Sequence, residues 1–298
     1  MPTYPFLQID AFTDVPLAGN PCAVVFNSEN LDDSTMLAIT REMNLSETAF
    51  VRRSGAGGFA ARYFTPATEI PFAGHPTIAT AFALVYAGLL PLTGDLTVFD
   101  LTLNVGPIRV EIQAEGGQVQ QIVMTQQKPV FLATYEAGQV LPLFGLPAEA
   151  AHPEVPIQTV STGTPQLMVP LQKLDDLRRA QIDIPAYIAF RAQADFFSPH
   201  LFCLAGATPA GQTFARHLDA PPDLPEDPFT GSATGGMAAY LWHYGLLEGP
   251  KFTAEQGHWM DRPGQASVEV LGPRAAIEAI RVGGAAVLVA QGELILNR

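Results

Sequence analysis

The sequence EIPFAGHPTIATAFALVYAGLL, residues 69–90, has a second copy in the chain: EDPFTGSATGGMAAYLWHYGLL, residues 226–247. The two segments align without a gap at a spacing of 157 residues and are identical at ten of 22 positions, including Pro71, Phe72 and Gly74 of the first copy. Chance rarely places Pro, Phe and Gly together in this way. We infer an internal repeat, and therefore two domains of similar fold.

Each copy is typical of a turn followed by a helix. Pro76 suits the first helical position, where its missing N–H leaves no hydrogen bond unmade. This placement predicts His75 as the residue that caps the first helix. Ser232 occupies the same position in the second copy, and serine is a favoured N-cap residue.

Both predicted helices lack charged residues and end at a glycine. Residues 77–87 carry no charge, and residues 233–244 carry none apart from His243 if it is protonated. Gly88 and Gly245 suit the left-handed residue that ends many helices. We therefore expect two buried central helices. Their amino-terminal N–H groups and positive dipole ends are suited to anion binding, and we expect them to face a shared cleft.

The composition indicates a globular protein with a small-molecule partner. The chain has 298 residues, of which 48% are hydrophobic and 15% charged, enough for two domains with large cores. Its formal net charge of −13 argues against binding to nucleic acid or to an anionic membrane surface, because both depend on basic clusters.

The chain has no targeting or membrane signal that we can identify. The two cysteines, Cys22 and Cys203, predict buried thiols rather than a disulfide framework. The first residues lack the basic and apolar regions of a signal peptide. The longest charge-free apolar run, residues 79–92, is shorter than a membrane-spanning helix requires. We expect a cytoplasmic protein.

The pattern along the chain divides it near residue 128. We expect an N-terminal half at 1–128, a C-terminal half at 129–280, and a last strand within 281–298 that packs back on the first half. A strand, Gly-x-Pro, strand order occurs at residues 19–21 and again at 163–165. A helix is predicted at 33–43 with Asp32 as its cap, and residues 208–225, rich in proline, are predicted to form a loop.

Acid and base groups remain once the recognisable motifs are excluded. The histidines lack the close spacing of a zinc site, and the chain has no glycine-rich nucleotide loop and no Gly-x-Ser-x-Gly motif. Glu47 lies in a short polar link, and His75 and Asp227 flank the predicted helix starts. These three could transfer protons. Alternatively, Glu47 and Asn20 are turn residues, His75 is a cap, and Asp227 stabilises a helix dipole.

Several motifs, in order, resemble the phenazine-biosynthesis PhzF-like family of isomerases. They lie at residues 12–21, 45–50, 64–76 and 226–233, with Glu255-Gln256-Gly257 and Arg262-Pro263 near the end. The resemblance implies the diaminopimelate-epimerase-like fold: an α+β protein with two pseudo-symmetric domains, each a curved mixed sheet around a central helix. It also implies a homodimer.

The same resemblance implies a chemistry. A well-understood family member isomerises trans-2,3-dihydro-3-hydroxyanthranilate, a small carboxylate, without a cofactor or metal. By motif, Glu47 would take and return the proton, with His75 and Asp227 as the other catalytic groups. The residues expected to bind the substrate are Asn20, Gly74, Gly231 and Ser232.

Two other functions stay open at this stage. One is an amino-acid epimerase or racemase of the same fold. Racemases of this fold place a cysteine at each helix start, whereas here His75 and Ser232 hold those positions, which excludes a two-thiol mechanism. The other is a non-catalytic protein that binds a small molecule. The joint presence of Glu47, His75, Asp227 and Ser232 favours an enzyme.

Overall fold

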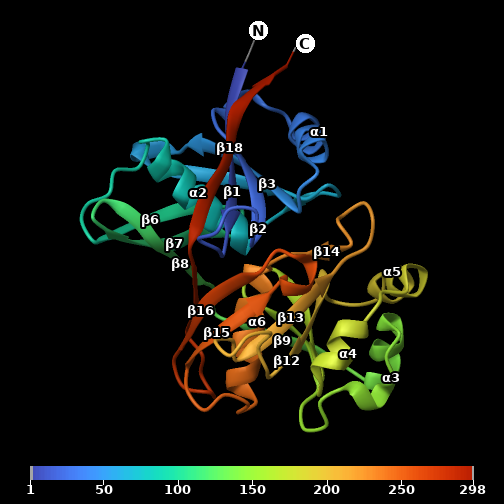
Figure 1. Cartoon of the computed structure of the whole chain (residues 1–298). Coiled ribbons are helices and arrows are strands. Elements are labelled where there is room, and N and C mark those ends of the chain that lie inside the picture. The colour runs from blue at the N-terminus through green and yellow to red at the C-terminus, as the bar shows by residue number, and fades with distance from the viewer. Residues whose placement is uncertain (1–2, 297–298) are drawn as a thin grey trace. The chain divides into compact units, whose positions relative to one another are not determined.

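Two units make up the chain, and each contains one long buried helix (Figure 1). The computed structural model describes residues 3–296. The first unit comprises the chain up to Thr125 together with the segment from Gly283 onward, and the second comprises Gln126–Val282.

Within the described residues, the first unit contains eight strands that begin before its boundary at Thr125, two α-helices, and the last strand of the chain. Its elements are β1 (Thr3–Ala11), β2 (Asn20–Val25), α1 (Asp33–Met43), β3 (Glu47–Arg53), β4 (Phe59–Phe64), β5 (Glu69–Ile70), α2 (Gly74–Tyr86), β6 (Leu96–Leu103), β7 (Gly106–Glu115), β8 (Gln118–Gln126) and β18 (Ala286–Ile295). Strand β18 pairs antiparallel with β1, so the C-terminal segment returns to the unit in which the chain begins.

The second unit repeats this order with additional short helices. Its elements are β9 (Val130–Tyr135), α3 (Ala137–Val140), β10 (Ile157–Ser161), β11 (Pro165–Pro170), α4 (Leu174–Arg179), α5 (Ile184–Arg191), β12 (Ser198–Cys203), β13 (Thr213–Leu218), β14 (Glu226–Asp227), α6 (Gly231–His243), β15 (Lys251–Gln256), β16 (Gly264–Leu271) and β17 (Ala279–Gly284), whose last two residues belong to the first unit.

The strand pairings of the two units correspond one to one. In the first unit β1–β2 is antiparallel, β2–β3 parallel, β3–β4 antiparallel, β4–β6 parallel and β6–β7 antiparallel. The second unit has the same directions in β10–β11, β11–β12, β12–β13, β13–β15 and β15–β16. The two strands of each parallel pair are connected by a segment that contains a helix, because parallel neighbours need a long crossover connection. The repeat seen in the sequence is therefore a repeat of topology.

The central helices are buried because they lack a polar face. Helix α2 packs on β1, β2, β3 and β18, and α6 packs on β10, β11 and β16. Several identities of the repeat have structural reasons. Phe72 and Phe229 are buried, and Thr77 and Thr234 each donate to the carbonyl four residues earlier. The glycines that end the helices, Gly88 and Gly245, have φ of 68° and 76°.

The predicted helix caps are wrong by two residues. Ala73 and Thr230 are the N-caps, so His75 and Ser232 are the second residues of α2 and α6. Pro76 is therefore third in its helix, a position where its missing N–H also costs no intrahelical bond. The prediction for residues 33–43 is confirmed, because Asp32 caps α1 by accepting from the Thr35 N–H.

The predicted loop at residues 208–225 is also wrong in part, because strand β13 occupies Thr213–Leu218 within it. The prolines lie on both sides of that strand, where they do not interrupt its hydrogen bonds. Strand β13 is central to the second unit, since it pairs with β12, β14 and β15.

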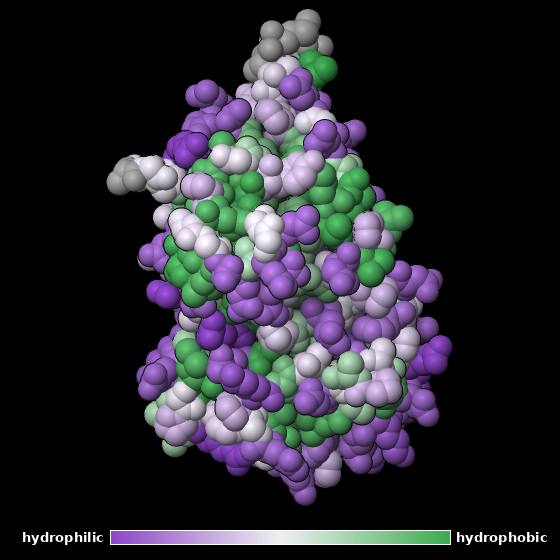
Figure 2. Space-filling view, turned by 60° about the vertical axis from the view of Figure 1, so that its left-hand side comes forward, coloured by the Kyte–Doolittle hydropathy of each residue, from purple (hydrophilic) through white to green (hydrophobic). Residues whose placement is uncertain are grey.

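Apolar side chains fill the core of each unit. On the face shown in Figure 2, hydrophobic side chains are interspersed with hydrophilic ones rather than gathered in one band. Cys22 and Cys203 are buried free thiols, as predicted. Among residues 3–296, no helix is both long enough and apolar enough to span a membrane.

Candidate active site

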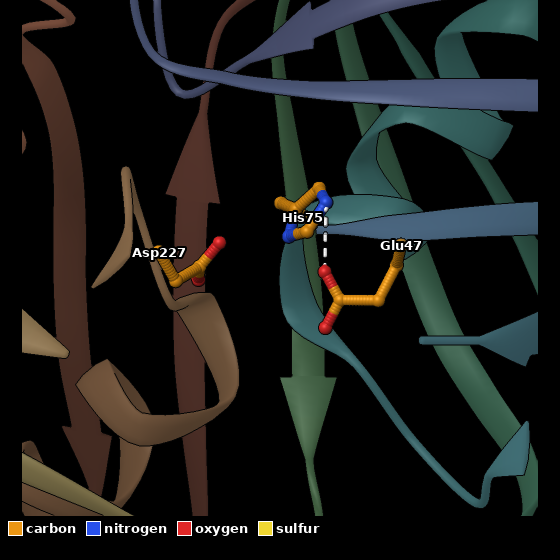
Figure 3. Close-up of side chains that lie close together, drawn as sticks. All are labelled: Glu47, His75 and Asp227. Carbon is orange, nitrogen blue, oxygen red and sulfur yellow. Dashed lines mark ion pairs between the residues drawn. The ribbon is translucent and has the colours of Figure 1, made fainter. Parts of the chain in front are cut away.

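A carboxylate and an imidazole face each other in the first unit (Figure 3). Glu47 is the first residue of β3, and His75 lies in the first turn of α2. The His75 Nε2 atom is 3.2 Å from the Glu47 Oε2 atom. The His75 side chain is only 2% exposed, whereas that of Glu47 is 14% exposed. The carboxylate thus keeps some access to solvent while its imidazole partner is buried.

Asn20 fixes the orientation of the His75 ring. The Asn20 Nδ2 atom is 2.9 Å from His75 Nδ1, and both residues are buried. Because an amide nitrogen can only donate, Nδ1 accepts, and the ring proton lies on Nε2, toward Glu47. Gly19 makes this placement possible: its φ is 56°, and a Cβ atom there would lie 2.2 Å from the Ala11 carbonyl oxygen.

Replacing Asn20 with Asp tests this chain of contacts. The change keeps the size of the side chain but puts an acceptor opposite His75 Nδ1, so we expect Nδ1 to carry a proton. The ¹⁵N chemical shifts of the ring would report it. Because this position is completely buried, the new carboxylate should also lower the free energy of unfolding by at least about 1–3 kcal/mol. Unchanged ring shifts would show that Asn20 does not set the tautomer.

Cys22 lies beside Glu47 but is not suited to act as a nucleophile. It pairs with Glu47 in the parallel register of β2 and β3 and is completely buried. Burial, and then the Glu47 carboxylate, raise the pKa of the Cys22 thiol well above its usual value. The thiol therefore stays protonated and gives Glu47 a neutral neighbour.

The second unit holds the other predicted residues around the start of α6. Asp227 ends the short strand β14, and Gly231 and Ser232 are the first two residues of the helix. The Thr230 hydroxyl donates to Asp227 Oδ2 at 2.5 Å. Figure 3 shows the Asp227 carboxylate extending from the segment that leads into α6.

Gln256 holds this segment in place. Its Nε2 donates to the Asp227 carbonyl at 2.7 Å, and its Oε1 accepts from the Thr230 N–H at 3.0 Å. The side chain is buried. The side-chain amide of Gln256 thus links Asp227 and Thr230, the residues on either side of the turn before α6. These two bonds hold the main chain at Asp227 in place.

The repeat is asymmetric at the position of Glu47. In the first unit Cys22 pairs with Glu47, and in the second unit Gln166 pairs with Ser198 at the matching place in the parallel register. Ser198 donates to Gln166 Oε1 at 2.7 Å and lies 2.7 Å from His217 Nε2. The first unit therefore carries a carboxylate where the second carries a hydroxyl group.

The structure thus assembles the predicted residues in two groups. The first unit brings together Asn20, Glu47, Gly74 and His75, and the second brings together Asp227, Gly231 and Ser232. The sequence reasoning missed four polar residues of neighbouring strands: Arg62, Arg216, His200 and His217. The repeated Ala-Arg pairs at 61–62 and 215–216 were a signal that could have found the two arginines.

Two units with matching topology, each built around a buried central helix, define the epimerase-like α+β fold, and relatives that match over nearly the whole chain make the protein an isomerase. The family model of phenazine biosynthesis-like proteins matches residues 9–292, and the chain belongs to that family.

Curated relatives are named as isomerases. The trans-2,3-dihydro-3-hydroxyanthranilate isomerase of Pseudomonas fluorescens is 32% identical over 294 residues, which cover 98% of this chain and 99% of the relative. The uncharacterised isomerase YfhB of Bacillus subtilis (strain 168) is 31% identical over 266 residues, 89% of each chain.

Solved structures agree with the fold prediction. The Bacillus anthracis phenazine biosynthesis protein of the PhzF family has a TM-score of 0.85 at 28% identity and covers 99% of this chain and 100% of its own. A probable proline racemase from Agrobacterium radiobacter K84 has a TM-score of 0.71 at 10% identity, covering 99% of this chain and 93% of its own. The prediction of an α+β, epimerase-like fold is confirmed.

Proposed function

We propose that the protein is a cofactor-independent isomerase that moves a proton within a small carboxylate substrate by general acid and base catalysis. Glu47 removes an acidic C–H proton and returns it to a different carbon, while the double bonds of the substrate shift. The substrate is neither oxidised nor reduced. The net reaction therefore needs no second substrate.

The observation that carries this proposal is the chain of contacts from Asn20 through His75 to Glu47. Asn20 fixes the tautomer of His75, and its Nε2–H faces the carboxylate 3.2 Å away. A partly exposed carboxylate with a buried neutral imidazole beside it can accept a proton and hold it for return. Ser198 replaces this carboxylate in the second unit, which favours a single base over a symmetric two-base mechanism.

The other predicted residues would bind the substrate. Asp227 and Ser232 would form hydrogen bonds with its amino or hydroxyl groups. The N–H groups of Gly74 and Gly231, at helix starts, would bind its carboxylate or a developing enolate charge. The relative from P. fluorescens is named for trans-2,3-dihydro-3-hydroxyanthranilate, and a compound of that class is the first substrate we propose.

Proton NMR in D₂O tests the function. Wild-type protein with trans-2,3-dihydro-3-hydroxyanthranilate should form an isomerised product that carries deuterium at the carbon that gains the proton. Amino and hydroxy acids complete the panel. Deuteration of an amino acid at Cα with loss of optical rotation would assign the protein to the epimerases instead. Absence of exchange across the panel would contradict the proposal for these substrate classes.

A further inference from the structure

An arginine and a glutamate form a two-bond pair in front of each central helix. In the first unit, Arg62 Nε and Nη2 donate to Glu69 Oε1 and Oε2 at 2.7 and 2.6 Å. In the second unit, Arg216 Nε and Nη2 donate to Glu226 Oε1 and Oε2 at 2.9 and 2.7 Å. The arginines lie on β4 and β13, and the glutamates begin β5 and β14. The same pair thus occurs at the same place in both repeats.

Each pair is tied to a further helix through the third arginine nitrogen. Arg62 Nη1 donates to Asp33 Oδ1 at 2.8 Å, at the first residue of α1. Arg216 Nη1 donates to the carbonyls of Leu177, Arg178 and Ala180 at 3.0, 3.2 and 2.8 Å, at the end of α4. Each guanidinium group therefore joins a long strand, a two-residue strand and a crossover helix.

The short strands need such support because the backbone holds them weakly. Strands β5 and β14 have two residues each and follow turns at 65–68 and 219–225. Strand β5 ends four residues before α2, and Asp227 is the residue after Glu226. A shift of these strands would therefore move His75 or Asp227 directly.

We propose that Arg62–Glu69 and Arg216–Glu226 are positioning pairs that set the places of His75 and Asp227, respectively. Their role in catalysis rests on the function proposed above. The side chains are between 15% and 24% exposed, so solvent screens them only in part. Two parallel N–H···O bonds fix direction as well as distance, which a lysine cannot do. Consistently, the hydrogen bonds from Arg62 lower the pKa of Glu69.

Amide hydrogen exchange of Arg62→Lys and Arg216→Lys tests the proposal without any substrate. Lysine keeps the charge but loses the planar fork. We expect exchange at residues 69–76 to rise about tenfold or more in Arg62→Lys, with residues 226–233 unchanged, and the reverse in Arg216→Lys. Arg109→Lys, which alters the more exposed Arg109–Glu111 ion pair, is the matched control and should change neither segment.

A second measurement separates positioning from a general loss of stability. The ¹⁵N signals of the His75 ring should shift in Arg62→Lys and stay in place in Arg216→Lys, at a temperature where both are fully folded. Once a substrate is known, kcat should fall more than KM rises. If Arg62→Lys fails to fold, Glu69→Gln gives the same readouts. The proposal would be wrong if amide exchange at the helix starts did not change, or if each variant changed both helix starts equally. These outcomes can be read even if the protein is inactive on every substrate tried, so the test is separate from that of the proposed function.

Discussion

Replacing Glu47 with Gln should lower the rate of deuterium incorporation into substrate by about 10²–10⁴-fold, the usual contribution of a general base. The amide keeps the size of the side chain but cannot accept the proton. The amide oxygen can take the place of the carboxylate oxygen that lies 3.2 Å from His75 Nε2, so the site should keep its shape. We expect the free energy of unfolding to change little, and substrate affinity to persist while turnover is lost.

Glu42→Gln is a suitable control, because it makes the same chemical change at an exposed position five residues earlier. It should leave the exchange rate unaltered. Measurement of both variants by NMR in D₂O at matched protein concentration decides the role of Glu47. If Glu47→Gln exchanges deuterium at the wild-type rate, another group is the base, and the mechanism proposed here is wrong.

The second large effect concerns a buried histidine pair in the second unit. His200 and His217 lie opposite each other on β12 and β13, with their Nδ1 atoms 3.3 Å apart. Since Ser198 donates its proton to Gln166, His217 Nε2 must donate to the Ser198 hydroxyl group, and its Nδ1 accepts from His200. This arrangement needs the His217 ring to be neutral, because an accepting Nδ1 atom carries no proton. Strand β13 also pairs with β14, and in that pairing His217 lies opposite Asp227.

Acid should therefore destabilise the fold through these rings. Burial lowers the pKa of His217 to about 4, against the opposing effect of Asp227. Burial and then His217 also lower the pKa of His200. In the unfolded chain a histidine titrates near 6.5. Between about pH 6.5 and 4 the unfolded state thus binds more protons, and stability falls as the pH falls. For His217 alone the loss approaches about 3 kcal/mol.

Urea unfolding of wild-type protein and His217→Gln at several pH values between 7.5 and 4.5 measures this contribution. The variant should lose stability less steeply as the pH falls, whatever its stability at pH 7.5. The quantity to compare is the difference between the pH slopes of the two proteins. Burial raises the pKa of the nearby Asp219, which makes both proteins gain stability as the pH falls and so opposes the effect of the histidines. Parallel curves for wild type and His217→Gln would refute a neutral buried ring.

Much of the fold is encoded in local patterns. The repeat of 69–90 at 226–247 predicted two similar domains because the same turn, buried helix and glycine end recur, and each depends on residues near in sequence. The motif around Glu47 and the one before His75 indicated two side chains that the structure brings within 3.2 Å of each other. The caps were misplaced because Pro76 is acceptable at any of the first helical positions, so its position did not fix the start of the helix.

What the sequence determined by itself, then, is the repeated α+β architecture, the two buried helices and the residue types available for proton transfer. Tertiary structure decided which of these residues meet. Asn20 contacts Nδ1 of His75 and Glu47 lies near Nε2 only because β2 and β3 pair in parallel beside α2. The Arg–Glu pairs and the histidine pair likewise depend on the register of β4, β12 and β13 with their neighbours. That register is set by packing between distant segments, which no local pattern specifies.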